Sequence, residues 1–267
     1  MNPLSATVDG GQVASLFLVL LRCTGFIVTA PIFGHRATPR PVKAGLAAIL
    51  AITLAGGAAV APGAQPILLA APIELLIGVS MGFTLALGFS AVESASRLLS
   101  IQMGLSLGAV FDPVGGEAST PFDPLFAIMA GLLFLLLNLH LAVVGVLADS
   151  FTTLPIGGGW PSSLFASVAQ LIALSVEIAV RIAMPLALIL MLAELAVALI
   201  SRAIPQVNVF FLGLPLKIML GIALVALALP NILEGMAGVF RFMISGTAQA
   251  AIVAGTVVAS PLPSVMP

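Results

Sequence analysis

Charged side chains are scarce in this chain: nine Lys or Arg and ten Asp or Glu make up 7% of 267 residues. A soluble domain carries about 25% charged residues. Hydrophobic residues make up 61% of the sequence, and the mean hydropathy is +1.26. Most of the surface must therefore lie against lipid or other protein. The net charge of −1 gives no basis for a nucleic-acid partner.

Metal ligands and catalytic groups are also few. The single cysteine, Cys23, cannot form an internal disulfide, and the two histidines, His35 and His140, lie far apart with no ligand pair beside them. The sequence contains no H-E-x-x-H and no P-loop. Ser150 follows Asp149 and lies ten residues after His140, which is weak support for a catalytic triad. We expect no enzyme activity, no metal and no cofactor.

Long apolar runs predict helices, because they are continuous, rich in Leu and Ala, and lack the alternation of a barrel. About 20 apolar residues cross a bilayer. Leu164–Ile200 is too long for one simple span and should tilt, break near Met184–Pro185, or extend beyond the hydrocarbon. The fold class is therefore all-α, an integral membrane helical protein. The candidate helices are Val13–Gly34, Ala44–Ala61, Ile67–Val92, Leu125–Ala148, Leu164–Ile200, Val209–Pro230 and a weaker seventh at Gly235–Ala259.

Several charged residues lie inside these apolar runs, where each costs about 2.5 kcal/mol or more in lipid. They indicate either a subunit of a larger polar-lined assembly or charges that are satisfied inside an ordinary bundle. Glu93 with Arg97, and Glu177 with Arg181, are spaced to meet on one helix face, and we favour the second interpretation for them. Both interpretations stay open for Arg22 and Lys217. The intramembrane charges are Arg22, Glu74, Glu177, Arg181, Glu194 and Lys217.

Small and flexible residues also occur within the runs. Gly78 and Gly82 make a small-xxx-small spacing that permits close contact between helices. Six methionines are flexible and polarizable, and we interpret them as core packing rather than as a ring that seals a pore. These methionines are Met81, Met103, Met129, Met184, Met191 and Met219.

The segment Ser106–Pro121 interrupts the helical pattern. Its glycines permit unusual backbone angles, and Pro113 and Pro121 are incompatible with a helix interior. Non-helical backbone at membrane depth is tolerated only where protein buries it or water lines it. The segment is therefore either an ordinary loop between helices or a loop that works in a polar path.

Two stretches are more specific than hydropathy. The first is Arg202–Lys217, which reads R-x-x-P-Q-x-N-V-F-x-L-G-x-P-L-K, and the second is Gln102–Ser106 followed by Phe111–Pro113. With these motifs the chain resembles the FliR family of flagellar type III export-gate proteins, which has a homologous injectisome component. The resemblance runs from about Arg22 to Gly221. Supporting residues are Arg22, Pro31, Phe33, Gly34, Pro39, Asp149, Ser150, Phe151, Leu154 and Pro155.

The resemblance implies a structural and gating subunit of the export gate in the bacterial inner membrane, in the flagellar basal body. Its partners would be FliP-type, FliQ-type and FlhB-type subunits, and unfolded export substrates would pass through the shared pore. Residues 1–160 would be a FliP-like helical region, 161–260 a FliQ-like helical hairpin region, and 261–267 a flexible tail. The alternatives are an injectisome subunit of the same family, a secondary transporter and an intramembrane hydrolase.

The resemblance also assigns roles to two segments. The loop 106–121 would occlude the pore at rest, with Val110, Phe111 and Val114 as the apolar seal. The expected plug residues are Ser106, Leu107, Gly108, Val110, Phe111, Asp112, Pro113, Val114, Gly115 and Gly116. The string Arg202–Lys217 is either a helix-breaking turn or a contact with the neighbouring FliQ-type and FlhB-type subunits. The expected interface residues are Arg202, Pro205, Gln206, Asn208, Val209, Phe210, Gly213, Pro215 and Lys217.

Overall fold

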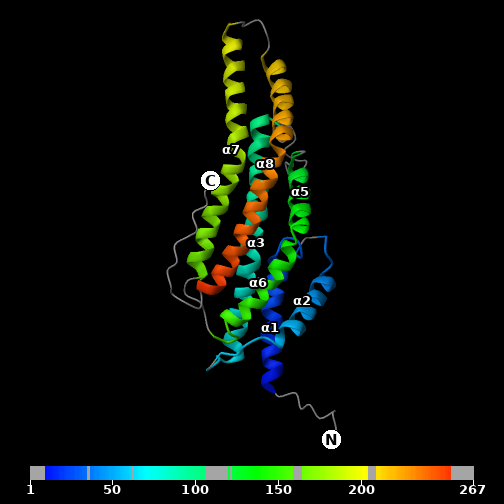
Figure 1. The fold of residues 1–267 in the computed structure, drawn as a ribbon, viewed down its shortest axis with the longest axis vertical. Helices are drawn as coiled ribbons and strands as arrows, with labels where there is room; N and C mark the ends of the chain where they lie inside the picture. The colour runs from blue at the N-terminus through cyan, green and yellow to red at the C-terminus, as the bar shows by residue number, and fades with distance from the viewer. Residues whose placement is uncertain are drawn as a thin grey trace. The chain divides into compact units, whose positions relative to one another are not determined.

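The computed structural model describes residues 10–34, 37–61, 63–105, 120, 122–158, 164–203 and 209–253. Regular structure in these ranges is helical, apart from one isolated parallel β-bridge between Val60 and Ile156. The expected all-α fold of an integral membrane protein is confirmed. The helices, labelled in Figure 1, are α1 (Gly10–Thr29), α2 (Arg40–Ala55), α3 (Ile67–Met103), α5 (Phe122–Leu136), α6 (Leu139–Thr153), α7 (Leu164–Ala203) and α8 (Val209–Val253).

The chain divides into two compact units. The first contains α1, α2, α3 as far as Ala86, α6 from Leu141, α7 as far as Leu171, and α8 from Met243. The second contains α3 from Leu87, α5, and most of α7 and α8.

Three helices are much longer than a simple membrane span. α3 has 37 residues, α7 has 40 and α8 has 45. At about 1.5 Å per residue, α7 is about 60 Å long, twice the hydrocarbon thickness of about 30 Å. Within the described residues, α1, α3, α7 and α8 each contain a stretch apolar enough to cross a membrane, and α5 with α6 could make a fifth span.

Several expected helix boundaries are wrong. α7 continues through Pro185 without the expected break. α8 continues through Pro230, so the two helices expected at Val209–Pro230 and from Gly235 onward are one helix. α3 extends eleven residues beyond Val92, to Met103. The helix expected over Leu125–Ala148 is interrupted at Leu137–Asn138, where Asn138 has a φ of 53°. Asn is one of the few non-glycine residues that adopts this left-handed conformation at low cost.

In the first unit, α2 packs on α1 and small residues bring α1 against α3. A Cβ on Gly78 would overlap the backbone carbonyl oxygen of Arg22, so the two helices touch backbone to backbone. A Cβ on Gly82 would overlap the side chain of Thr29, whose hydroxyl donates to the carbonyl of Val79 at 3.2 Å. The close contact expected from the small-xxx-small spacing is confirmed.

The second unit is built on apolar contacts among α3, α5, α7 and α8. The ring of Phe89 lies 5.5 Å from that of Phe134 and 4.7 Å from that of Phe240, which joins α3, α5 and α8. α7 and α8 run antiparallel (Figure 1), with Gly235 of α8 against Ile182 of α7.

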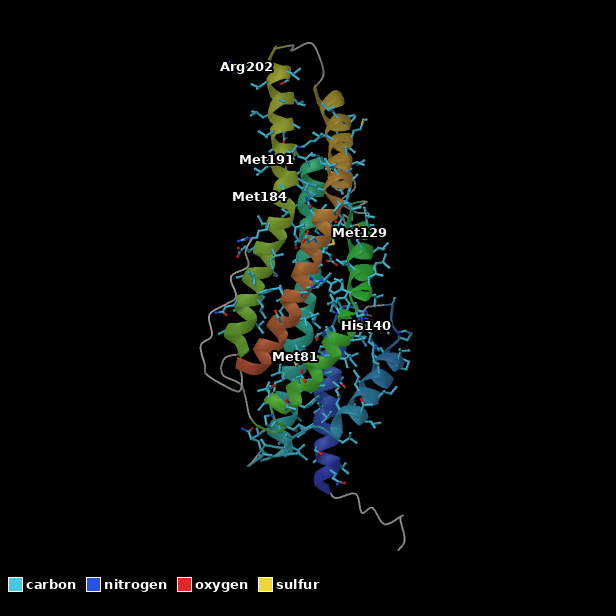
Figure 2. All side chains as sticks on the ribbon, viewed as in Figure 1. Met81, Met129, His140, Met184, Met191 and Arg202 are labelled. Carbon is cyan, nitrogen blue, oxygen red and sulfur yellow. The ribbon has the colours of Figure 1, made fainter. Side chains whose placement is uncertain are left out.

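The methionines have two different environments. Met81 and Met103 are buried, as expected for core packing, and Met129 is half-buried. Met184 and Met191, labelled on α7 in Figure 2, and Met219 on α8 are exposed. The core-packing interpretation is therefore wrong for these three, which lie on helix faces that the chain does not cover.

Candidate functional site

Arg22, in the middle of α1, lies at the centre of a buried polar cluster in the first unit. Its guanidinium has no exposed surface and pairs with the Glu74 carboxylate of α3 at 2.6 Å. It also donates to the backbone oxygens of Ser150 and Leu154, both at 3.0 Å, and lies 4.6 Å from the Phe151 ring centroid. These contacts tie α1 and α3 to the C-terminal end of α6.

The second oxygen of Glu74 continues the network into two connecting segments. It accepts a hydrogen bond from the Gly157 amide at 3.1 Å. Next to Gly157, the Ile156 amide donates to the Ala59 carbonyl at 2.8 Å, and the Ala61 amide donates to the Ile156 carbonyl at 3.0 Å. A buried ion pair is stable only when its remaining hydrogen-bonding groups are satisfied, and here they are. Of the two interpretations left open for Arg22, the structure thus supports the one in which residues of the same chain neutralise its charge and accept its hydrogen bonds.

Ser150 is held in the same cluster. Its hydroxyl donates to the Leu147 carbonyl at 2.7 Å and accepts from Arg22 at 3.3 Å. A hydroxyl engaged in this way is poorly placed to act as a nucleophile, which needs a base at its proton. Among the described residues, no group of three or more His, Cys, Asp or Glu could hold a metal ion.

The intramembrane charges of the second unit lie on α7 and α8. Arg181 pairs with Glu177 at 2.6 Å, one turn apart, and both side chains are exposed. Lys217 of α8 pairs with Glu194 of α7 at 3.0 Å and so links the two antiparallel helices. The Glu177–Arg181 spacing is confirmed as an ion pair. Glu93 and Arg97 are both exposed, and no ion pair joins them in the described part of α3.

The expected interface string lies partly on helices and partly outside the described residues. Arg202 is exposed in the last turn of α7 (Figure 2), where a cation complements the helix dipole. Pro205, Gln206 and Asn208 lie outside the described residues. The backbone from Val209 to Lys217, which includes Phe210, Gly213 and Pro215, forms the first turns of α8, so a turn over the whole of Pro205–Lys217 is wrong.

The expected plug residues Ser106–Gly116 lie outside the described residues, and the structure describes Leu105 on one side of them and Thr120 on the other. At the N-terminal end, Gly104 has a φ of 79°, and the Leu105 amide donates to the Ser100 carbonyl at 3.0 Å. With the Gly104 amide bound to Ile101 at 3.0 Å, this is a Schellman motif that ends α3. The buried Met103 side chain packs on Gly221 of α8.

At the C-terminal end, Thr120 and Asp123 start α5. The Thr120 amide donates to Asp123 Oδ2 at 2.8 Å, and the Thr120 hydroxyl lies 2.7 Å from the Ser100 hydroxyl. Ser96 donates to Asp123 Oδ1 at 2.9 Å. Sequence reasoning missed these four residues. The Thr-x-x-Asp spacing, a variant of the capping box, was the available signal.

Comparison with known proteins identifies the family. The family model for bacterial export proteins, family 1, matches residues 13–243. The chain is 36% identical over 222 residues to the flagellar biosynthetic protein FliR of Escherichia coli (strain K12), covering 81% of this chain and 84% of that protein. The chain belongs to the FliR family of bacterial export proteins. The resemblance drawn from the Arg202–Lys217 string is thus confirmed.

Other FliR relatives match over similar lengths. FliR of Pectobacterium carotovorum subsp. carotovorum is 34% identical over 227 residues, covering 82% of this chain and 86% of the relative. FliR of Bacillus subtilis (strain 168) is 30% identical over 237 residues, covering 86% of this chain and 92% of the relative. The family relation therefore includes both units rather than one helix pair.

Proposed function

We propose that this chain is a structural and gating subunit of the flagellar type III protein export gate in the bacterial inner membrane. It would form the substrate-conducting pore with FliP-type and FliQ-type subunits and contact the FlhB-type subunit. The observation that carries this proposal is the likeness to flagellar FliR proteins over more than four fifths of the chain. Residues 1–160 would be the FliP-like region, 161–260 the FliQ-like hairpin region and 261–267 a flexible tail.

The surface of α7 and α8 supports a role inside an assembly. In the most apolar stretch of each helix only 17% of the residues are buried within the chain, against 56% in α3. Exposed ion pairs lie on the same two helices as exposed leucines and methionines. Charged pairs are costly against lipid tails, so partner protein is the better neighbour for these faces. The string Arg202–Lys217 would be part of this contact.

The acidic residues favour this proposal over a secondary transporter. Ion coupling uses intramembrane carboxylates that exchange partners along a pathway. Glu74, Glu177 and Glu194 each pair with an Arg or Lys of the same chain. Each of the three carboxylates thus has a cationic partner within the chain, which argues against exchange of partners along a pathway.

Deletion of residues 109–118 tests the gating part of the proposal. We propose that segment 106–121 occludes the pore at rest, so its shortening should raise the ion leak of membranes that contain the assembled gate. The readout is membrane conductance, with secretion of flagellar proteins as the check that the gate assembles. Unchanged leakage in a gate that still assembles would contradict a plug.

Co-purification tests the assembly part. The chain, expressed with its FliP-type, FliQ-type and FlhB-type partners, should be recovered with them in one detergent-stable complex. A stable, monodisperse monomer that does not bind these partners would overturn the proposed function.

A further inference from the structure

The part of α3 that belongs to the second unit carries a short polar stripe on its exposed face. Four exposed residues share this face at the i, i+3, i+4, i+7 spacing of a helix, over about 10 Å of its length, and we call them the α3 stripe. The opposite face is packed, because Ser96 is buried there and donates to Asp123 of α5. The residues of the α3 stripe are Ser90, Glu93, Ser94 and Arg97.

The two charges of the α3 stripe do not neutralise each other. Among the described residues, neither Glu93 nor Arg97 takes part in an ion pair. Glu177 and Arg181 have the same i, i+4 spacing and are also exposed, but they do pair, at 2.6 Å. The spacing therefore permits a pair that α3 does not form. An anion and a cation one turn apart are left for another molecule.

Protein is a better neighbour for the α3 stripe than lipid or water. α3 contains a stretch apolar enough to cross a membrane, and lipid tails can pair with neither charge. An anionic headgroup would attract Arg97 but repel Glu93 one turn away. A wall that faces water should stay polar along its length, whereas this face continues into the exposed apolar side chains of Leu98 and Ile101. A mosaic of apolar area with a few polar groups is typical of a contact between proteins.

We propose that the α3 stripe is a further contact with a partner subunit of the export gate, in addition to the faces of α7 and α8. It would dock a partner helix that carries a basic residue opposite Glu93 and an acidic residue opposite Arg97. This inference rests on the proposed function, in which the chain is one subunit of an assembled gate. The two charges would also fix the register of the contact, because a shift by one turn brings like charges together.

An exchange of the two charges tests the contact. Glu93→Arg with Arg97→Glu keeps the net charge and the i, i+4 spacing of opposite charges within the chain, but it sets each partner charge against its like. In the co-expressed gate, we expect recovery of the partner subunits to fall at least about tenfold. Thermal unfolding of the full chain in detergent should be almost unchanged, because both side chains are exposed. Normal recovery of the partners would overturn the proposal.

Two further variants show whether sign and place matter. Glu93→Gln with Arg97→Gln removes the attraction without adding repulsion, so its loss of partners should be smaller than that of the exchange. Arg40→Glu is the charge-reversal control, because Arg40 is exposed at the start of α2, where an acidic residue complements the helix dipole. Its partner recovery should stay within about twofold of the native level. A loss in Arg40→Glu as large as that of the exchange would also overturn the proposal.

Ser94→Cys tests whether the α3 stripe is covered in the gate. The native Cys23 has no exposed surface, so a membrane-impermeant maleimide should label the variant at residue 94 and leave the native chain unlabelled. Labelling should be at least about tenfold slower in the purified gate than in the full chain alone in detergent, because a partner helix excludes the reagent. Equal rates would show that this face meets water in the gate and would contradict the contact. This readout does not require the charge variants to assemble.

The outcomes separate this inference from the proposed function. If the native chain forms no complex with its partners, the proposed function is wrong and the α3 stripe loses its partner with it. If the native complex forms, and either the exchanged variant forms it equally well or residue 94 stays accessible in it, the α3 contact is wrong and the proposed function stands. Loss of assembly on exchange, together with protection of residue 94, supports both.

Discussion

The buried ion pair of the first unit and the exposed ion pairs of the second use the same residue types in opposite ways. Arg22 and Glu74 have at most 2% of their side chains exposed and are surrounded by hydrogen-bond partners from α6 and its following loop. Arg181, Glu177 and Glu194 have 51–73% of their side chains exposed, whereas Lys217, the partner of Glu194, has 17% exposed. The Arg22–Glu74 pair is satisfied inside the first unit, whereas the Glu177–Arg181 pair lies at the surface of the second.

This difference separates two roles for charge in an apolar chain. A buried pair with satisfied hydrogen bonds fixes which helices meet, and breaking it leaves a bare charge in the interior. An exposed pair contributes little to the fold itself. Its presence on long apolar helices is the feature from which the proposed contact with a neighbouring subunit is argued. The predictions below test this contrast, from the largest expected effect to the smallest.

Arg22→Met should have the largest effect. It leaves the buried Glu74 carboxylate without its counter-charge and removes the Arg22 donors to the Ser150 and Leu154 carbonyls, at a cost of about 3–5 kcal/mol. We expect little folded protein in membranes and a much lower thermal unfolding temperature in detergent. The companion variant Arg22→Met with Glu74→Met removes both charges, so it should be less destabilised than Arg22→Met alone. Equal loss in both variants would show that charge pairing is not the cause.

Gly78→Ala should come next. The new methyl group would meet the carbonyl oxygen of Arg22, so α1 and α3 must separate, with an overpacking cost of about 1–3 kcal/mol. Gly145→Ala on α6 is the matched control, because nothing lies within 4 Å of the added Cβ. It should be neutral or stabilising by up to about 1 kcal/mol. Thermal unfolding of both variants in detergent measures the contrast, and similar stability would argue against backbone contact at Gly78.

Lys217→Ala should affect assembly more than folding. The Lys217–Glu194 pair joins α7 to α8, but Glu194 is largely exposed, so the chain alone should lose about 1 kcal/mol or less. Recovery of the partners by co-purification should fall further than chain stability does. A large loss of chain stability with normal partner recovery would show that this pair serves the fold of the chain rather than its assembly.

Glu177→Gln should have the smallest effect on the isolated chain. The Glu177–Arg181 pair is a single exposed pair one helical turn apart, worth about 0.3–0.5 kcal/mol. Thermal unfolding in detergent should be almost unchanged. A loss similar to that of Arg22→Met would remove the distinction between the two units.

The sequence predicts the helices well where hydropathy and chain geometry agree. It fails where polar residues continue a helix, as in α3 beyond Val92, because Ser96 and Ser100 are buried by contacts with α5 that lie far away in sequence. The sequence also predicts that a helix ends at Pro230. In the structure α8 continues through this residue, because a long helix that packs along its length tolerates an internal proline. The break at Asn138 has only a weak local signal, since neither Gly nor Pro marks it.

The polar clusters were less predictable than the helices. Arg22 and Glu74 could each be recognised as costly intramembrane charges, but they lie 52 residues apart and no periodicity pairs them. The Ser150, Leu154 and Gly157 groups that complete the network are contributed by ordinary backbone or a common hydroxyl. The Glu177–Arg181 pair was predictable because one helix turn alone brings these side chains together.

Photo-crosslinking from the exposed faces of α7 and α8 tests the central claim most directly. A photoreactive residue at Leu192, 66% exposed on α7, or at Leu227, 81% exposed on α8, would be introduced into the full chain in native membranes. The account predicts adducts of discrete mass with FliP-type or FliQ-type subunits at both positions. Adducts with lipid alone, in cells that still export flagellar proteins, would contradict it.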